Sequence, residues 1–138
     1  MPLSADESLR ELLGLSPVAM IGVTETSNTP SHDVPAYLID HGTEIIPVNP
    51  NYDQLFGEQV YPSLERVPIE CPLVTVFGSS AEVPRIVDVA IDRNDVVAVW
   101  LQHDIRHSEA VARGEQAGLL IVQDRCMRIE YDRLISRE

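Results

Sequence analysis

The sequence predicts an α/β fold, namely a three-layer sandwich with a mostly parallel, five-stranded sheet and helices on both faces. Short runs of strand length recur along the chain and are almost continuously apolar, which is typical of strands buried on both faces of a sheet. Segments with apolar residues at intervals of three and four separate these runs. Because strands alternate with helices, we expect parallel β–α–β units.

The first half of the chain predicts two helices and two strands. Ser4 and Glu7 have the spacing of an N-terminal capping box, and Gly14 ends the helix that this box would begin. Pro47 lies within a predicted strand, so we expect it where the sheet needs no backbone donor. The expected elements are a helix at 4–14, a strand at 17–23, a helix at 31–41, a strand at 44–50 and a polar connection at 51–61.

The second half predicts the other three strands. Ser79 or Ser80 can cap a helix whose apolar positions run to residue 91, and Gly118 stops the next helix. Trp100 and Tyr37 are interpreted as core or helix-packing residues. The expected elements are a helical turn at 62–67, strands at 72–77, 95–101 and 119–122, and helices at 80–91, 107–117 and 128–136.

The carboxyl ends of these strands are the expected place for a ligand. In open parallel sheets, ligands bind beyond the strand ends, at the point where the strand order reverses. The candidate site therefore lies in the loops at 24–31, 49–52, 77–80, 102–107 and 123–127.

The charge balance excludes some partners. The chain has 22 acidic and 10 basic residues, a net charge of −12, and its basic residues are all arginine. Such a surface repels nucleic acid and anionic membranes, so neither is an expected partner. This composition is interpreted as an adaptation to high salt, where screening removes self-repulsion; compositional drift in a GC-rich genome is the alternative.

Length and cysteine content indicate an ordinary soluble domain. A chain of 138 residues is expected to form a single domain over 1–138 without a disulfide or a metal. Cys71 and Cys126 are its two cysteines, and its first residues lack the pattern of a signal peptide. Since no apolar run approaches the roughly 20 residues that cross a bilayer, we expect a cytoplasmic protein.

The loop at 24–31 is rich in hydroxyl groups and leads into a helix, whose N-terminus suits a phosphate. The alternative is that Ser31 merely caps this helix. The loop lacks the glycine fingerprint of dinucleotide sites, and the second strand ends in Asn49 rather than in an acidic residue. Both absences disfavour NAD.

The sequence resembles the stand-alone CoA-binding domain proteins, relatives of the CoA-binding domain in the succinyl-CoA synthetase alpha subunit. The resemblance covers residues 18–134, and the order and spacing of its segments make it specific. The matching segments are VAMIGV at 18–23, PS at 30–31, IPVNP at 46–50, VYPSL at 60–64, WLQ at 100–102, AGL at 117–119 and DRC at 124–126.

The resemblance implies a Rossmann-like fold that binds coenzyme A. The loop after the first strand would wrap the pyrophosphate, the second and third strands would end beside the adenosine, and the fourth and fifth would end at the far rim. The implied contacts are Gly22, Val23, Thr24, Thr26, Ser27, Pro30 and Ser31 in the first loop, then Asn49, Pro50, Asn51, Phe77, Gly78 and Ser79, and finally Gln102 and Arg125.

Three positions depart from the family pattern. Members commonly have basic residues where this chain has Thr29, Asn51 and Gly78. Because a charge-assisted hydrogen bond is roughly twice as strong as a neutral one, we expect weaker binding of CoA, or a different ligand.

Two other groups of residues have chemistry that could form a site. His103 and His107, with Cys126 nearby, have metal-ligand chemistry but match no established zinc spacing, so a polar loop and a helix start are favoured and no metal is expected. Cys126 could be a reactive thiol with a pKa lowered by Arg125, but a buried, inert cysteine is favoured.

The residues support a binding protein better than an enzyme. No nucleophile, base and orienting group can be assembled, so no catalytic residue is predicted. We expect a non-catalytic module for CoA or an acyl-CoA, serving as a sensor, a carrier or a subunit in a homodimer or with another protein. The alternatives are a thiol enzyme or redox protein that uses Cys126 with CoA thioesters or disulfides, and an interaction protein with a degenerate nucleotide site.

Overall fold

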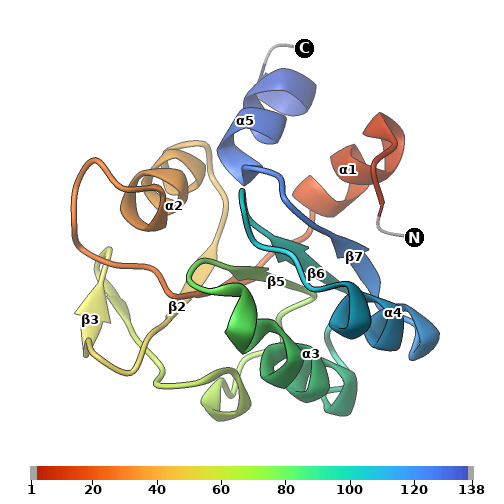
Figure 1. Cartoon of the computed structure of the whole chain (residues 1–138). Coiled ribbons are helices and arrows are strands. Elements are labelled where there is room, and N and C mark those ends of the chain that lie inside the picture. Colours follow the sequence, from red (N-terminus) through yellow and green to blue (C-terminus); the bar gives the residue numbers. More distant parts are fainter. Residues whose placement is uncertain (1–2, 137–138) are drawn as a thin grey trace.

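The computed structural model describes residues 3–136 and confirms the predicted α/β sandwich (Figure 1). Its five-stranded sheet has the order β2–β1–β5–β6–β7, and every neighbouring pair is parallel. The strands are β1 (Val18–Ile21), β2 (Ile45–Val48), β5 (Leu73–Val76), β6 (Ala98–Leu101) and β7 (Leu120–Val122). Each lies inside a run that the sequence predicted, because burial on both faces required apolar residues throughout.

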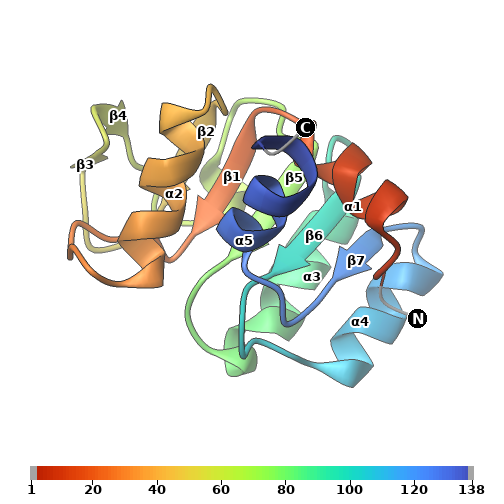
Figure 2. The ribbon, with the colours of Figure 1, turned by 90° about the horizontal axis from the view of Figure 1, so that it is seen from above.

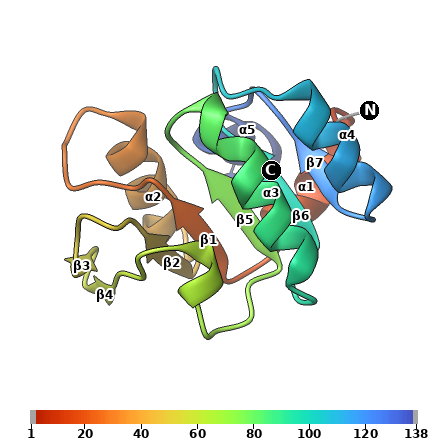
Figure 3. The ribbon, with the colours of Figure 1, turned by 60° about the horizontal axis from the view of Figure 1, so that its bottom comes forward.

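Helices cover both faces of the sheet (Figures 2 and 3). One face carries α1 (Asp6–Leu13), α2 (Pro30–Asp40) and α5 (Met127–Tyr131), and the other carries α3 (Val83–Asp92) and α4 (Ser108–Gln116). The buried residues accordingly form two clusters. Trp100 is fully buried and Tyr37 packs against the same cluster, as predicted. No helix within residues 3–136 is long and apolar enough to cross a membrane.

Pro47 lies in β2, at the edge of the sheet. Its carbonyl oxygen accepts a hydrogen bond from the Tyr61 N–H at 3.1 Å, on the side that faces away from β1. The N–H and C=O of one strand residue point to the same side. The N–H that proline lacks would therefore point outward too, and the pairing with β1 is unaffected.

The strand order reverses between β1 and β5, because the chain runs from β1 to β2 on one side and returns to β5 on the other. Gly22 follows β1 at this point with φ of +88°, and a Cβ there would lie 2.2 Å from the Phe77 carbonyl oxygen. Only glycine permits this approach of the two strand ends. Sheets with this order bind ligands at the reversal, so Gly22 marks the expected site.

Arg93 ties together the opposite, amino end of the sheet. Its guanidinium donates to the carbonyl oxygens of Leu64, Val67 and Ile69 at 2.9, 2.8 and 3.1 Å. It also donates to both carboxylate oxygens of Asp95, at 3.0 and 2.7 Å. These bonds hold the segments that precede β5 and β6.

Several helix ends differ from the prediction, and α3 begins at Val83 rather than at residue 80. Ala5 rather than Ser4 is the N-cap of α1, and no side chain bonds to the first turn, so the predicted capping box does not form. The last helix was expected at 128–136, whereas α5 ends at Tyr131 and continues as a π-helical turn, η3 (Asp132–Ser136).

The predicted connection at 51–61 contains a hairpin of β3 (Gln54–Leu55) and β4 (Glu58–Gln59). Its turn residues Phe56 and Gly57 have φ of 56° and 75°, as in a type I′ turn. The sequence did not predict this hairpin because phenylalanine occupies a turn position that asparagine or glycine usually fills.

Candidate functional site

Two cavities open at the carboxyl ends of the strands, on either side of the segment Phe77–Gly78, which lines both. The β2-side cavity has a volume of about 240 Å³. The α5-side cavity has a volume of about 480 Å³. The β2-side cavity is lined by residues that include Gly22, Asn49, Pro50, Asn51, Glu65 and Arg85. The α5-side cavity is lined by residues that include Pro30, Ser31, Gln102, Ile105, Cys126 and Ile129.

Hydroxyl groups close the loop between β1 and α2. The Ser31 hydroxyl lies 3.0 Å from the Thr24 hydroxyl and 3.2 Å from the Thr29 hydroxyl, and the Thr24 N–H donates to the Ser31 carbonyl at 3.0 Å. Thr29 is the N-cap of α2 and Pro30 follows it, so Ser31 does not cap this helix. The predicted phosphate-loop residues are thus brought together, but their hydroxyls bond to one another.

Thr26 and Ser27 lie at the exposed tip of this loop, next to Asn28, which has φ of 67°. The Asn28 N–H donates to the Asp33 carboxylate at 3.2 Å. A hydrogen bond from His32 and the one from Asn28 hold the pKa of Asp33 below its usual range. The Asp33 carboxylate therefore already accepts hydrogen bonds from donors near the start of α2. Its negative charge would repel a phosphate bound at this loop.

Asn49 fastens the loop after β2 to the loop after β1. Its side-chain nitrogen donates to the Val23 carbonyl at 2.9 Å, and its side-chain oxygen accepts from the Asn51 N–H at 2.9 Å. Asn49 and Val23 are both buried, while Pro50 and Asn51 are exposed at the β2-side cavity. Asn49 thus positions the cavity wall. From the sequence alone, this structural role could not be distinguished from direct contact with a ligand.

The segment after β5 turns sharply between the two cavities. Gly78 has φ of +128°, and a Cβ there would lie 2.9 Å from the Glu82 carboxylate. The Ser79 hydroxyl accepts from the Ala81 N–H at 3.2 Å and caps the 3₁₀ turn η2 (Ser80–Glu82). Ser79 therefore caps this turn, whereas the N-cap of α3 is Glu82 and the predicted side-chain cap of that helix does not form. Gly78 allows the tight passage between the two cavities.

Arg85 brings a positive charge to the β2-side cavity, and sequence reasoning missed it. It extends from the first turn of α3, and its guanidinium lies 3.3 Å from the Glu65 carboxylate, with both side chains exposed. Glu82 also lines this cavity. The available signal was the position of Arg85 at the start of a helix that follows a predicted site loop.

Gln102 and Arg125, the two residues implied for the far rim, have different positions. Gln102 is buried at the α5-side cavity, where it donates to the Thr75 hydroxyl at 2.6 Å and accepts from the Met127 N–H at 3.0 Å. Arg125 is paired with Glu130 at 3.0 Å and lines neither cavity. Cys126 was favoured as a buried cysteine, whereas it is only partly buried and lines the α5-side cavity.

The structure does not bring His103, His107 and Cys126 together as a metal set. His107 is the N-cap of α4, where its Nδ1 accepts from the Ala110 N–H at 3.1 Å. Asp104 and Asp124 instead lie near His103, with one ligand atom from each residue within 4.8 Å of the others. Arg106 forms an ion pair with Asp124, so this carboxylate already has a cationic partner.

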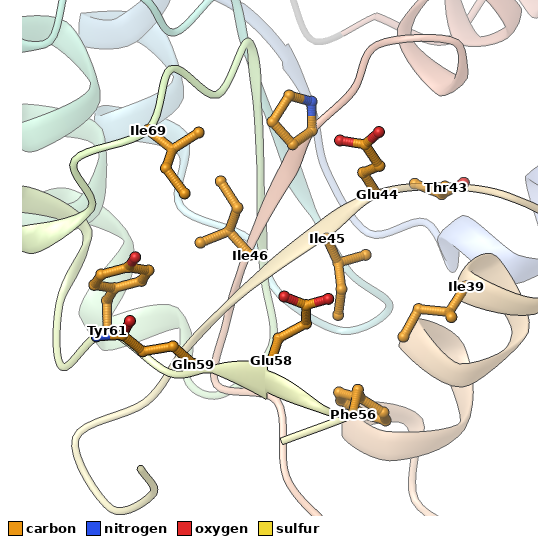
Figure 4. Close-up of a pocket in the computed structure, with 11 residues that line it drawn as sticks. Ile39, Thr43, Glu44, Ile45, Ile46, Phe56, Glu58, Gln59, Tyr61 and Ile69 are labelled. Atoms are coloured by element: carbon orange, nitrogen blue, oxygen red, sulfur yellow. The ribbon is translucent and has the colours of Figure 1, made fainter. Parts of the chain in front are cut away.

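A third cavity lies along the outer edge of β2 beside the hairpin (Figure 4). Ile45, Ile46 and Phe56 provide apolar surface, and Glu44 and Glu58 are its charged residues. No arginine or histidine is among the residues that line it. This cavity is therefore unsuited to a phosphate-bearing ligand.

Known proteins resemble this chain over most of its length. The sequence pattern of the CoA binding domain family matches residues 16–132. The uncharacterized protein YneT of Bacillus subtilis (strain 168) is 27% identical over 124 residues, which cover 89% of this chain and 91% of YneT. A hypothetical protein from Pyrococcus horikoshii OT3 is 32% identical with a TM-score of 0.91, covering 98% of this chain and 96% of its own.

Larger CoA enzymes match only in part. The ADP-forming acetate–CoA ligase of Methanocaldococcus jannaschii is 30% identical over 71 residues, which are 51% of this chain but 10% of the ligase. A dinucleotide-forming acetyl-coenzyme A synthetase of Ca. Korarchaeum cryptofilum shares the fold, with 20% identity, a TM-score of 0.69 and coverage of 82% of this chain and 27% of its own. Since the family pattern spans most of its length, this chain belongs to the CoA-binding domain family.

Proposed function

We propose that residues 1–138 act as one unit that binds coenzyme A across the carboxyl ends of the strands. The nucleotide occupies the β2-side cavity, and the pantetheine arm crosses Phe77–Gly78 toward the α5-side cavity. One observation carries this proposal: two cavities share the Phe77–Gly78 segment where the strand order reverses. An elongated ligand with a charged end and a less polar end fits such a pair.

Arg85 supplies the charge that the ligand phosphates need. Its partner Glu65 is exposed, and a surface ion pair of this kind is worth little, so Arg85 can exchange the carboxylate for a phosphate at small cost. Glu65, Glu82 and the net charge of −12 oppose the anion. Salt weakens this repulsion, since the Debye length falls to about 3 Å at molar ionic strength. Binding therefore strengthens with salt, which fits a protein of a saline cytoplasm.

The proposed role is binding without catalysis. Within residues 3–136, neither the Cys126 thiol nor the Ser31 hydroxyl contacts a histidine or a carboxylate that would act as its base. An adjacent base of this kind is a common way to activate a nucleophile. A sensor or carrier of the ligand requires only the two cavities.

One observation favours a second candidate function, in which Cys126 exchanges with CoA disulfides or thioesters. Cys126 lines the α5-side cavity, where the pantetheine arm ends in our proposal. This function predicts that a thiol reagent labels Cys126 stoichiometrically near neutral pH and that CoA slows the labelling. If the protein binds CoA but Cys126 is unreactive, the non-catalytic role is supported instead.

The test is calorimetric titration with CoA, dephospho-CoA, ADP and NAD at low and molar potassium chloride. We expect binding of CoA, tighter at molar salt and weaker for dephospho-CoA, and no binding of NAD. Arg85→Ser should lower the affinity for CoA by about tenfold. A charge-assisted hydrogen bond contributes roughly 1.5–3 kcal/mol, and we expect the lower end because the contact with Arg85 is partly solvated. Arg113→Ser is the matched control, since Arg113 pairs with Asp88 on α3 outside both cavities.

Two outcomes would contradict the proposal. Failure of CoA to bind in either salt would leave an interaction protein with a degenerate site. An equal loss in Arg85→Ser and Arg113→Ser would place the nucleotide outside the β2-side cavity.

A further inference from the structure

We infer that the ligand carries a neutral, apolar acyl group in the α5-side cavity, so that the protein takes an acyl-CoA in preference to free CoA. This inference rests on the proposed function, because it places the sulfur end of coenzyme A at that cavity. It concerns the chemical class of the group attached to the sulfur, which neither the family nor the fold specifies.

The walls of the α5-side cavity are apolar over a large part of their surface. Pro30, Phe77, Ile105, Cys126 and Ile129 all contribute to the lining. The volume of about 480 Å³ lies within the range of small-molecule sites. A free thiol would leave much of this surface in contact with water.

Ile129 is the strongest sign that something apolar covers this cavity. It lies on α5, which packs beside α2 over the sheet (Figure 2), and 63% of its surface is exposed. The other exposed large apolar residues within 3–136 are Ile69, Val97 and Leu120, which are exposed to between 42% and 47% and line neither strand-end cavity. An acyl chain lying against Ile129 would remove apolar surface from water on both partners, which is favourable.

Two polar side chains of the cavity, those of Gln102 and Ser31, are already engaged within the fold. Gln102 bonds to Thr75 and to the Met127 N–H. Ser31 bonds to Thr24 and Thr29. A second carboxylate on the acyl group would therefore have to compete for groups that hold the loops together.

The charges around the cavity also disfavour an acidic acyl group. Asp104 and His103 line the cavity, and Asp124 lies close to both of these residues. The arginines of these loops already pair with carboxylates, Arg106 with Asp124 and Arg125 with Glu130. A dicarboxylic acyl group would have to displace one of these carboxylates and leave its negative charge beside the cavity, whereas an aliphatic group would not.

The test compares the affinities of CoA and of acetyl-, butyryl-, hexanoyl- and succinyl-CoA at molar potassium chloride. We expect affinity to rise by up to about fourfold for each buried methylene, as the transfer free energy of a CH₂ implies. Butyryl and succinyl groups both have four carbons, so this pair isolates the added carboxylate. We expect succinyl-CoA to bind at least tenfold more weakly than butyryl-CoA.

Ile129→Ser tests the location of the acyl group, with Ile69→Ser as the matched control at an exposed isoleucine beside the third cavity. We expect Ile129→Ser to lower the affinity for hexanoyl-CoA severalfold and to leave the affinity for free CoA unchanged. Ile69→Ser should change neither affinity. Equal affinities for CoA and all acyl-CoAs, or tighter binding of succinyl-CoA, would overturn the inference and leave the proposed function intact. Absence of binding by CoA and every acyl-CoA would instead reject the proposed function.

Discussion

The two ends of the parallel sheet use their charged residues differently. At the amino end, Arg93 is largely buried and makes five hydrogen bonds, three to carbonyl oxygens and two to Asp95. At the carboxyl end, Arg85 and Arg106 each pair with one carboxylate and are mostly exposed. Stability is therefore concentrated at the amino end, and the carboxyl end keeps arginines that can change partner.

Removal of Arg93 is the strongest test of whether stability is concentrated at the amino end of the sheet. Arg93→Ala removes the guanidinium that donates to three carbonyl oxygens and to Asp95, which keeps the Cys71 N–H as a donor, and loss of one partner of a buried charge network typically costs 3–5 kcal/mol. We expect a loss of about 4 kcal/mol in the free energy of unfolding, measured by urea denaturation.

Arg113→Ala provides the contrast, because its exposed pair with Asp88 should contribute less than about 1 kcal/mol. Similar losses in the two variants would show that stability is not concentrated at the amino end.

The carboxyl end has one rigid requirement, which is the approach of β1 to β5. Gly22→Ala adds a Cβ that would lie 2.2 Å from the Phe77 carbonyl oxygen, at a φ of +88°. Backbone strain and overpacking together should cost about 3 kcal/mol, and the displaced Phe77 should weaken CoA binding.

Gly42→Ala is the control for the strain alone. Gly42 has φ of +93° but a Cβ there would have no atom within 4 Å, so we expect a loss of about 1 kcal/mol. Equal losses at both positions in denaturation curves would mean that the close approach at Gly22 has no energetic role.

The same contrast explains what the sequence could predict. The five strands were predictable because burial on both faces leaves apolar runs, and the site loops follow from where those runs end. The division of labour within the loops was not predictable. Asn49 and Gln102 have the polar chemistry of ligand contacts, yet their partners come from other strands and loops that are distant in the sequence. Arg85 reaches the β2-side cavity only because of how α3 packs.

Low pH should weaken the ion pair at the amino end of the sheet, and this is the smallest of the three effects on the free energy of unfolding. Hydrogen bonds from Arg93 lower the pKa of Asp95 from 3.8 to about 2. Because the folded pKa is the lower one, the stabilisation is fully present above the unfolded pKa and is lost as pH falls through the folded value. The loss amounts to about 2 kcal/mol. We expect the difference in unfolding free energy between the wild type and Asp95→Asn to shrink by this amount between about pH 6 and pH 2. A difference that stays constant in urea titrations across that range would contradict this prediction.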